Sequence, residues 1–249
     1  MKVLLAGESW MTHSIHVKGF DSFTTSSYNE GAGPMIQALR DSGHDVVYLP
    51  NHFIANEFPS TPEALSDFDV LILSDVGVNT LLLPDKTFLR SERGVNRLHL
   101  IRDYVKEGGG LLMVGGYLTF QGIEAKGAYY GTPVEEALPV SLLPHDDRVE
   151  SPQGVVPNVV NQAHPILEGL DDWPHFLGYN RTKLKPDAEL LAAVDDDPFI
   201  ATVAFGRGRS AVFTSDCGPH WGPPEFVAWP HYGRMWSNLV TWLGQREEA

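Results

Sequence analysis

The sequence has 249 residues, of which 43% are hydrophobic, and a formal net charge of −14. A chain of this length can form one large α/β domain over residues 1–249, and it needs neither disulfides nor metal to bury a core. The acidic balance without a basic stripe argues against nucleic acid or an anionic membrane as a partner. The single cysteine excludes an intrachain disulfide and fits a reducing cytosol. No run approaches the roughly 20 apolar residues of a membrane span, so we expect a cytoplasmic protein.

The first half of the chain alternates apolar strands with amphipathic helices. Residues 11–30 have no clean period and are expected to form a long loop. The predicted elements around it are strands at 2–6, 44–49, 66–74 and 111–114, and helices at 34–43 and 95–105. Continuous apolar strands separated by helices predict an α/β fold with a mostly parallel sheet and helices on both faces.

The second half has a weaker pattern, with strands at 184–194, 198–205 and 210–214 and short helices at 132–138 and 164–170. Residues 153–160 are expected to form a small extra β arm, with Pro157 keeping it at an edge. The final helix is clear from one apolar stripe, which consists of Tyr232, Met235, Trp236, Leu239, Val240 and Leu243.

Polar residues directly follow the strands at 2–6 and 66–74. Glu8, Ser9 and Trp10 follow the first of these, and Asp75 follows the other. Open α/β sheets bind ligands at the carboxyl ends of their strands, so we expect these residues to contact a ligand. Helix capping or loop hydrogen bonds are the alternative role for the two carboxylates.

A glycine-rich turn, Gly115-Gly116-Tyr117, follows the strand at 111–114. Sharp turns after a strand hold the nucleophile in several α/β hydrolase-like folds. Here the turn carries a tyrosine. Tyr117 is either a hydrogen-bond donor or general acid to a bound ligand, or a bulky residue that closes the turn.

Asp216 and His220 follow the strand at 210–214, and Trp221 comes next. A carboxylate near a histidine can orient the imidazole for base catalysis, as in a triad without its nucleophile. The alternative is a surface histidine packed on Trp221, which could itself stack on a sugar or another planar ligand. His13 and His16 could join His220 in a metal site, but no ligand signature supports this, and we expect no metal or other cofactor.

Three segments together resemble a known family: the turn into GGY at 115–117, HPILEGL at 164–170, and GRGRSAVFTSD at 206–216 followed by a histidine. They are similar to the class I glutamine amidotransferase-like superfamily, in its glutamine amidotransferase-like branch, and to trehalose-utilisation-type domains. The resemblance covers nearly the whole chain. It implies a flavodoxin-like three-layer sandwich with the site at the carboxyl edge of the sheet.

The resemblance also shows what this sequence lacks. The family carries G-x-C-x-G at the elbow, where this chain has Tyr117 in place of the cysteine and Thr119 in place of the second glycine. His220 and Glu225 correspond to the family's late His and Glu, although H-P-E is stretched to H-W-G-P-P-E. A phenol with a pKa near 10 is a poor nucleophile, and Cys217 lies on a different loop, so we expect no ordinary glutaminase activity.

Three functions remain open from the sequence. The first is an enzyme, or a degenerate one, acting on a small polar metabolite such as a carbohydrate or an amide. In it His220 is the acid/base, Tyr117 donates to a substrate oxygen, and backbone N–H groups after Gly116 form an oxyanion pocket. The second is a non-catalytic binding or scaffold protein that keeps the pocket, and the third is a metal-dependent hydrolase using histidines. Aromatic residues in the loop at 221–231 and the arm around Val155 indicate a homo-oligomer.

Overall fold

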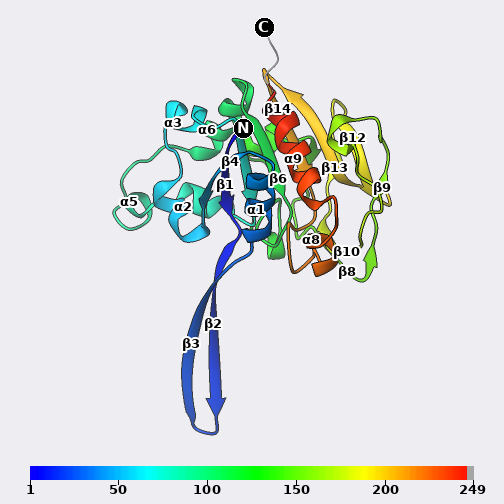
Figure 1. Cartoon of the computed structure of the whole chain (residues 1–249). Coiled ribbons are helices and arrows are strands. Elements are labelled where there is room, and N and C mark those ends of the chain that lie inside the picture. Colours follow the sequence, from blue (N-terminus) through cyan, green and yellow to red (C-terminus); the bar gives the residue numbers. More distant parts are fainter. Residues whose placement is uncertain (246–249) are drawn as a thin grey trace.

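The computed structural model describes residues 1–245. Within these residues, eight strands form one central sheet (Figure 1). Their order across the sheet is β4 (Asp45–Leu49), β1 (Lys2–Gly7), β5 (Val70–Ser74), β6 (Gly110–Val114), β14 (Gly208–Phe213), β13 (Asp197–Phe205), β12 (Glu189–Val194) and β9 (Asn158–Val159). The strands from β4 to β14 are parallel, and the remaining three continue the sheet antiparallel. The predicted α/β class with a mostly parallel sheet is confirmed.

Helices cover both faces of the sheet because the parallel strands are apolar on both sides. In β1, Val3 and Leu5 pack into one core cluster, whereas Leu4 and Ala6 pack into the other. The first cluster is closed by α1 (Gly33–Asp41) and α9 (Tyr232–Leu243). The second is closed by α2 (Asn51–Glu57), α3 (Pro62–Ser66), α4 (Val78–Leu82), α6 (Arg97–Lys106) and α7 (Pro133–Ala137).

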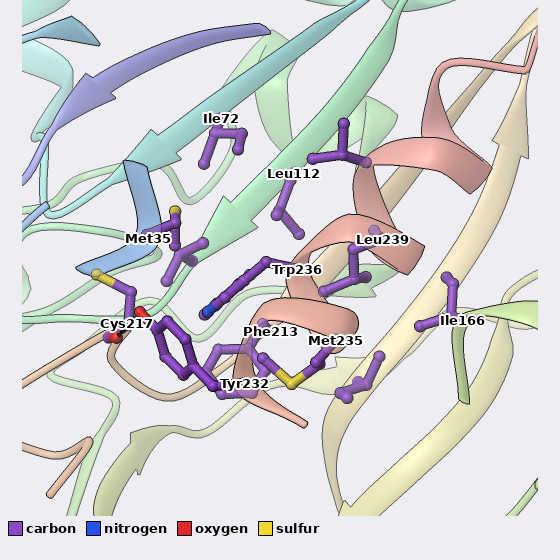
Figure 2. Close-up of a cluster of buried hydrophobic side chains, with 14 of the residues drawn as sticks. Met35, Ile72, Leu112, Ile166, Phe213, Cys217, Tyr232, Met235, Trp236 and Leu239 are labelled. Atoms are coloured by element: carbon purple, nitrogen blue, oxygen red, sulfur yellow. Dashed lines mark hydrogen bonds between the residues drawn. The ribbon is translucent and has the colours of Figure 1, made fainter. Parts of the chain in front are cut away.

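The apolar stripe of α9 forms the centre of the first cluster, as predicted. Figure 2 shows Trp236 and Leu239 against Leu112 and Phe213 of the sheet. Cys217 lies at the margin of the same cluster, where its backbone oxygen accepts a hydrogen bond from the Tyr232 hydroxyl at 2.7 Å. The carboxyl edge of the sheet, which Cys217 follows in the chain, therefore lies directly beside this core.

The predicted loop at residues 11–30 is wrong. This segment forms a β-hairpin, β2 (Ser9–Lys18) and β3 (Asp21–Glu30), which projects from the body in Figure 1 and is called the arm below. Nearly every residue on both faces of the arm is exposed, so burial imposes no strict alternation on its sequence. The connection is Gly19-Phe20, and the φ of 63° at Gly19 suits a two-residue turn with glycine first.

The extra β arm predicted at residues 153–160 is divided between two sheets. β8 (Arg148–Val155) pairs with β10 (Phe176–Asn180), whereas β9 joins the edge of the central sheet. Pro157 lies between them and cannot donate to either ladder. The remaining elements are short: α5 (Asp85–Phe88), α8 (Pro224–Val227), the 3₁₀ turns Ile123–Ala125 and Pro165–Leu167, and the pair β7 (Val140–Ser141) and β11 (Lys183–Leu184).

Candidate functional site

Three carboxyl groups lie at the carboxyl edge of the sheet. Glu8 follows β1, Asp75 follows the neighbouring β5, and Asp216 follows β14. Glu8 and Asp75 both have positive φ angles, 53° and 47°, which turn the chain sharply at the strand ends. Non-glycine residues in this region are strained and tend to occur at functional sites. Glu8 and Asp216 are only 5% and 6% exposed, so two of the three groups are buried.

Glu8 is connected to Cys217 through Ser74. The Ser74 hydroxyl donates to Glu8 Oε2 at 2.5 Å and lies 4.0 Å from Cys217 Sγ. One ligand atom from each of Glu8, Asp216 and Cys217 lies within 4.8 Å of the other two. Carboxylate oxygen and thiolate sulfur can both bind metal ions. These three residues could therefore hold a metal, and they are called the buried triad below.

Burial and mutual repulsion change the acidity of this group. Burial, together with the negative charge of Asp75, raises the pKa of Glu8 to about 7. Burial also raises the pKa of Asp216 well above its usual range, with additional contributions from the charges of Glu8 and Asp75. Burial raises the pKa of the Cys217 thiol as well, so this cysteine is a poor source of the thiolate needed for nucleophilic catalysis.

The turn after β6 does not form an oxyanion pocket. Its Leu118 N–H donates to Asp75 Oδ1 at 2.7 Å, and the Gly116 N–H donates to Asn180 Oδ1 at 2.9 Å. An internal carboxyl group therefore takes the place of a substrate oxyanion. The chain continues into irregular structure rather than a helix, so the predicted elbow geometry is also absent from residues 115–122.

Tyr117, His220 and Trp221 form an aromatic cluster above this turn, called the aromatic box below. The Tyr117 ring centroid lies 4.4 Å from that of His220, nearly perpendicular to it, and 5.6 Å from that of Trp221. The His220 and Trp221 rings are stacked at 5.4 Å. Trp221 is 1% exposed, whereas the His220 side chain remains 43% exposed. The aromatic box is therefore buried on the side of Trp221 and open to solvent on the side of His220.

Glu150 and Arg148 hold the aromatic box, and neither was predicted. Glu150 accepts hydrogen bonds from the Tyr117 hydroxyl at 3.1 Å and from Trp221 Nε1 at 3.0 Å. The Arg148 guanidinium lies 4.9 Å from the Tyr117 ring centroid. Both residues stand on one face of β8, two positions apart. Residues at i and i+2 of a strand lie on the same face, so this spacing could have indicated from the sequence that the two side chains lie together.

The two catalytic candidates of the box have shifted acidities. Burial raises the pKa of Tyr117, and the charge of Glu150 raises it further. Burial lowers the pKa of His220, an effect larger than the opposite influences of Glu150 and Asp75. Asp216 Oδ2 lies 4.0 Å from His220 Nδ1, beyond hydrogen-bond range. The structure thus brings the predicted pair close together without bonding it.

Three other predicted site residues lie outside this group. Glu225 is exposed on α8 and forms no hydrogen bond or ion pair with His220 in the described part of the chain. Trp10 is 43% exposed at the base of the arm. Ser9 is buried there, and its hydroxyl accepts from the Asn51 N–H at 2.8 Å. Ser9 therefore fixes the start of the arm to α2.

The metal hypothesis based on His13 and His16 is not supported. Both lie on β2 of the arm, where they contact Ser26 and Thr25. Residues three apart in a strand point to opposite faces, so the two imidazoles cannot share an ion. Among residues 1–245, the cluster suited to a metal is the buried triad.

The proposed oligomer contacts in the loop at 221–231 are also not as predicted. Trp221 and Trp229 are 1% and 7% exposed, and each indole N–H is already bonded within the chain. Exposed large apolar side chains lie on the arm, among them Met11, Ile15, Val17, Phe20 and Phe23. Others lie elsewhere on the surface, including Val156 and Val160 beside the predicted contact at Val155.

A mostly parallel sheet with polar residues gathered at its carboxyl edge is the arrangement of open α/β proteins that bind ligands at the strand ends. The chain matches the family model described as "Putative glutamine amidotransferase" over residues 2–245, and it belongs to that family. Its single cysteine is buried and lies outside the turn that carries the nucleophile in the family pattern. The predicted family is therefore confirmed.

Two solved structures from Salmonella typhimurium are similar to the chain along its whole length. "Cytoplasmic Protein STM3548" has 44% identity and a TM-score of 0.96, with 100% of both chains covered. "Cytoplasmic Protein STM1381", from strain LT2, has 46% identity and a TM-score of 0.95, covering 98% of this chain and 100% of its own. The structure of a "Putative thua-like protein" from Parabacteroides merdae shares the fold at 12% identity and a TM-score of 0.56, covering 98% and 90%.

A search of the curated proteins finds no match to this chain. No helix in residues 1–245 is long and apolar enough to cross a bilayer.

Proposed function

We propose that the protein binds a small, hydroxyl-rich metabolite, such as a carbohydrate, at the carboxyl edge of the sheet. The observation that carries the proposal is the position of the aromatic box beside several carboxyl groups. Pockets for small molecules combine apolar or aromatic walls with a few well-placed polar groups. Here the accessible aromatic groups are Tyr117 and His220, with the buried Trp221 behind them, and the polar groups include Asp75 and Glu150.

The polar groups favour a ligand that donates hydrogen bonds. Carboxylates accept and do not donate, so they match hydroxyl groups better than they match a ligand carboxylate. A sugar acid carries such a carboxylate without a compensating ammonium group, and the protein as a whole has a formal charge of −14. Repulsion between like charges discriminates against that ligand. A neutral polyol brings hydroxyl donors without this cost.

The chemistry of the turn argues against glutamine hydrolysis by a covalent intermediate. Tyr117 occupies the position of the family's cysteine, and burial raises its pKa. Cys217 is 1% exposed, and its thiol also has a raised pKa. Neither group is an activated nucleophile. His220 is the remaining group placed to exchange a proton with a ligand at the surface of the box.

A thermal-shift screen tests the proposal directly, because a ligand that binds only the folded state raises the melting temperature. The set should contain neutral sugars and polyols, the corresponding sugar acids, and glutamine. We expect a neutral compound to raise the Tm of the wild type, and Trp221→Ala or His220→Ala to reduce that shift strongly. Glu225→Gln, an exposed change on α8, is the matched control and should keep the shift.

Three results would contradict the proposal: a shift with sugar acids or glutamine alone, a sugar shift that survives both box variants, or no shift with any neutral sugar or polyol. If a sugar binds and no product forms on long incubation, the protein is a non-catalytic binder, which was the second function open from the sequence.

A further inference from the structure

The buried triad contains a polar atom without a partner. Asp216 Oδ1 is completely inaccessible and accepts no hydrogen bond in the described chain. The residue as a whole is 6% exposed. An unpaired polar group in the interior costs several kcal/mol of stability, and an unpaired charge costs more. Backbone N–H groups of Cys217 and Gly218 stabilise the Asp216 carboxyl group, but its Oδ1 atom has no partner among the described residues.

A proton alone does not solve this problem. A protonated carboxyl at Oδ1 would itself be a donor, and it would need an acceptor within hydrogen-bond distance. No such atom faces Oδ1. The ligand atoms of Glu8 and Cys217 lie within 4.8 Å of one carboxylate oxygen of Asp216. All three groups are electron-pair donors, which is the arrangement that a cation satisfies.

We propose that Glu8, Asp216 and Cys217 form a binding site for one divalent transition-metal ion of the zinc class. Two carboxylate oxygens and one sulfur form a mixed hard and soft donor set. The sulfur disfavours Mg²⁺ and Ca²⁺, which take oxygen ligands, and favours Zn²⁺ or Co²⁺. Three protein ligands leave one position of a tetrahedral ion open, as in catalytic zinc sites.

The surroundings support this site independently of the donor atoms. Ser74 donates to Glu8 Oε2, which leaves Oε1 free of that bond and orients the carboxyl group. Hydrogen bonds of this kind position metal ligands and strengthen binding. Asp75 lies near the group and contributes a further negative charge. The site also adjoins the aromatic box, because Asp216 Oδ2 lies 4.0 Å from His220 Nδ1.

Metal binding at this site has a defined proton balance. The thiol of Cys217 must lose its proton to form a metal–sulfur bond, and any proton on Glu8 or Asp216 is released to solvent in the same way. No oxidant or reductant takes part. Affinity is therefore expected to rise with pH, and the heat of binding should depend on the ionisation enthalpy of the buffer.

The test uses the full chain after exhaustive chelation. Zn²⁺ is titrated by calorimetry, and Co²⁺ by absorption, because a cobalt–thiolate bond produces an intense charge-transfer band. We expect one equivalent of metal, a rise in Tm, and a thiolate band with Co²⁺. Cys217→Ser should abolish the band. Glu8→Gln or Asp216→Asn should weaken Zn²⁺ binding by at least roughly 100-fold, because losing a ligand costs no less than losing an outer-shell partner.

Surface histidines are the main source of adventitious binding, so His13→Ala/His16→Ala is the matched control and should keep both the band and the affinity. Near-ultraviolet circular dichroism of each metal-free variant establishes that it is folded. Cys217→Ala is the second thiol variant if Cys217→Ser does not fold.

The proposal is overturned if the folded wild type binds no Zn²⁺, if Co²⁺ binds without a thiolate band, or if binding survives loss of Cys217 and disappears in the arm variant. Because Trp221 is not a ligand, Trp221→Ala should keep the metal while losing the metabolite shift. The two proposals can therefore fail separately.

Discussion

Asp75 Oδ1 accepts the backbone N–H of Leu118 at 2.7 Å, so a carboxyl group of the protein occupies the turn where the family pattern holds its nucleophile. In acyl-transfer enzymes such N–H groups stabilise the oxyanion of the transition state. The loss of the cysteine and the filling of this turn are therefore two separate obstacles to glutamine hydrolysis.

Restoring the thiol alone should not restore activity. In Tyr117→Cys we expect no release of ammonia from glutamine above the wild-type background, because the backbone donors remain bonded to Asp75. Adding Asp75→Gly frees the Leu118 N–H to act as an oxyanion donor. Because removal of one such donor typically costs about 10²–10³-fold in rate, we expect the double variant to release more ammonia than Tyr117→Cys alone. An ammonia assay that finds turnover in Tyr117→Cys by itself would show that the Asp75 contact is not an obstacle.

Gly178 controls the position of Trp221. A Cβ added at Gly178 would lie 2.3 Å from Trp221 Nε1 and 2.5 Å from Cδ1, so the ring must move away from Glu150. Overpacking of this kind typically costs about 1–3 kcal/mol. We expect Gly178→Ala to lower the free energy of unfolding by this amount in a urea titration and to reduce the metabolite thermal shift.

The matched control for that change is Gly33→Ala in the first turn of α1, where an added Cβ meets nothing within 4 Å. It should leave the metabolite shift unchanged. Equal losses of stability in both variants would contradict the role assigned to the Gly178 contact.

His44 should make the protein sensitive to mild acid. It is 9% exposed, and burial lowers its pKa, with a further contribution from the positive N-terminus. The unfolded chain then binds more protons than the folded one just below the ordinary histidine pKa of about 6.5. Stability contributed by the neutral form is present above this pH and is lost as the pH falls toward the lowered folded value.

Urea titrations at pH 7.5 and 5.5 should show a smaller difference in His44→Gln than in the wild type. His164, whose pKa is also lowered by burial, leaves a residual dependence in the variant. An unchanged pH dependence in His44→Gln would show that His44 is protonated equally in both states.

The arm should mediate self-association. Ile15 and Val17 are 74% and 72% exposed on one face of β2, and Phe20 at the tip is fully exposed. A two-stranded hairpin is at best marginally stable alone in water, which favours a partner for these surfaces. We expect sedimentation velocity to show an oligomer of the wild type and a smaller species for Ile15→Ser/Val17→Ser. Thr12→Ser, on the opposite face, should have no effect; a monomeric wild type would contradict this prediction.

The sequence predicted the parallel half of the sheet well because β1, β5 and β6 are buried on both faces and therefore read as continuous apolar runs. The same logic placed Glu8 and Asp75 at neighbouring strand ends. The hairpin of the arm was not predicted because neither of its faces is buried, so its strands show no strict alternation of apolar and polar residues. Only the Gly19-Phe20 turn indicates a hairpin in the sequence.

Within the site, strand ends were predictable but cross-chain contacts were not. Tyr117, His220 and Trp221 were named individually. The role of Glu150, in contrast, depends on the pairing of β8 with β10, in which Glu150 lies opposite Gly178, 28 residues further along the chain. Periodicity does not reveal such pairing when the intervening segment is irregular. Cys217 was set aside because it lies on another loop, yet folding brings that loop beside Ser74.

The arm leaves the body directly after Glu8 and returns directly before Gly31, whose N–H donates to the Glu8 carbonyl at 2.9 Å. An added Cβ at Gly31 would lie 2.7 Å from Glu8 Oε1, so this return point also touches the carboxyl group. Both ends of the arm are thus anchored at one residue of the buried triad. A partner that holds the arm therefore acts on the same short segment that shapes the site. If it changes the affinity of the site for a ligand, thermodynamic reciprocity requires that occupancy of the site change the affinity of the arm for its partner by the same factor.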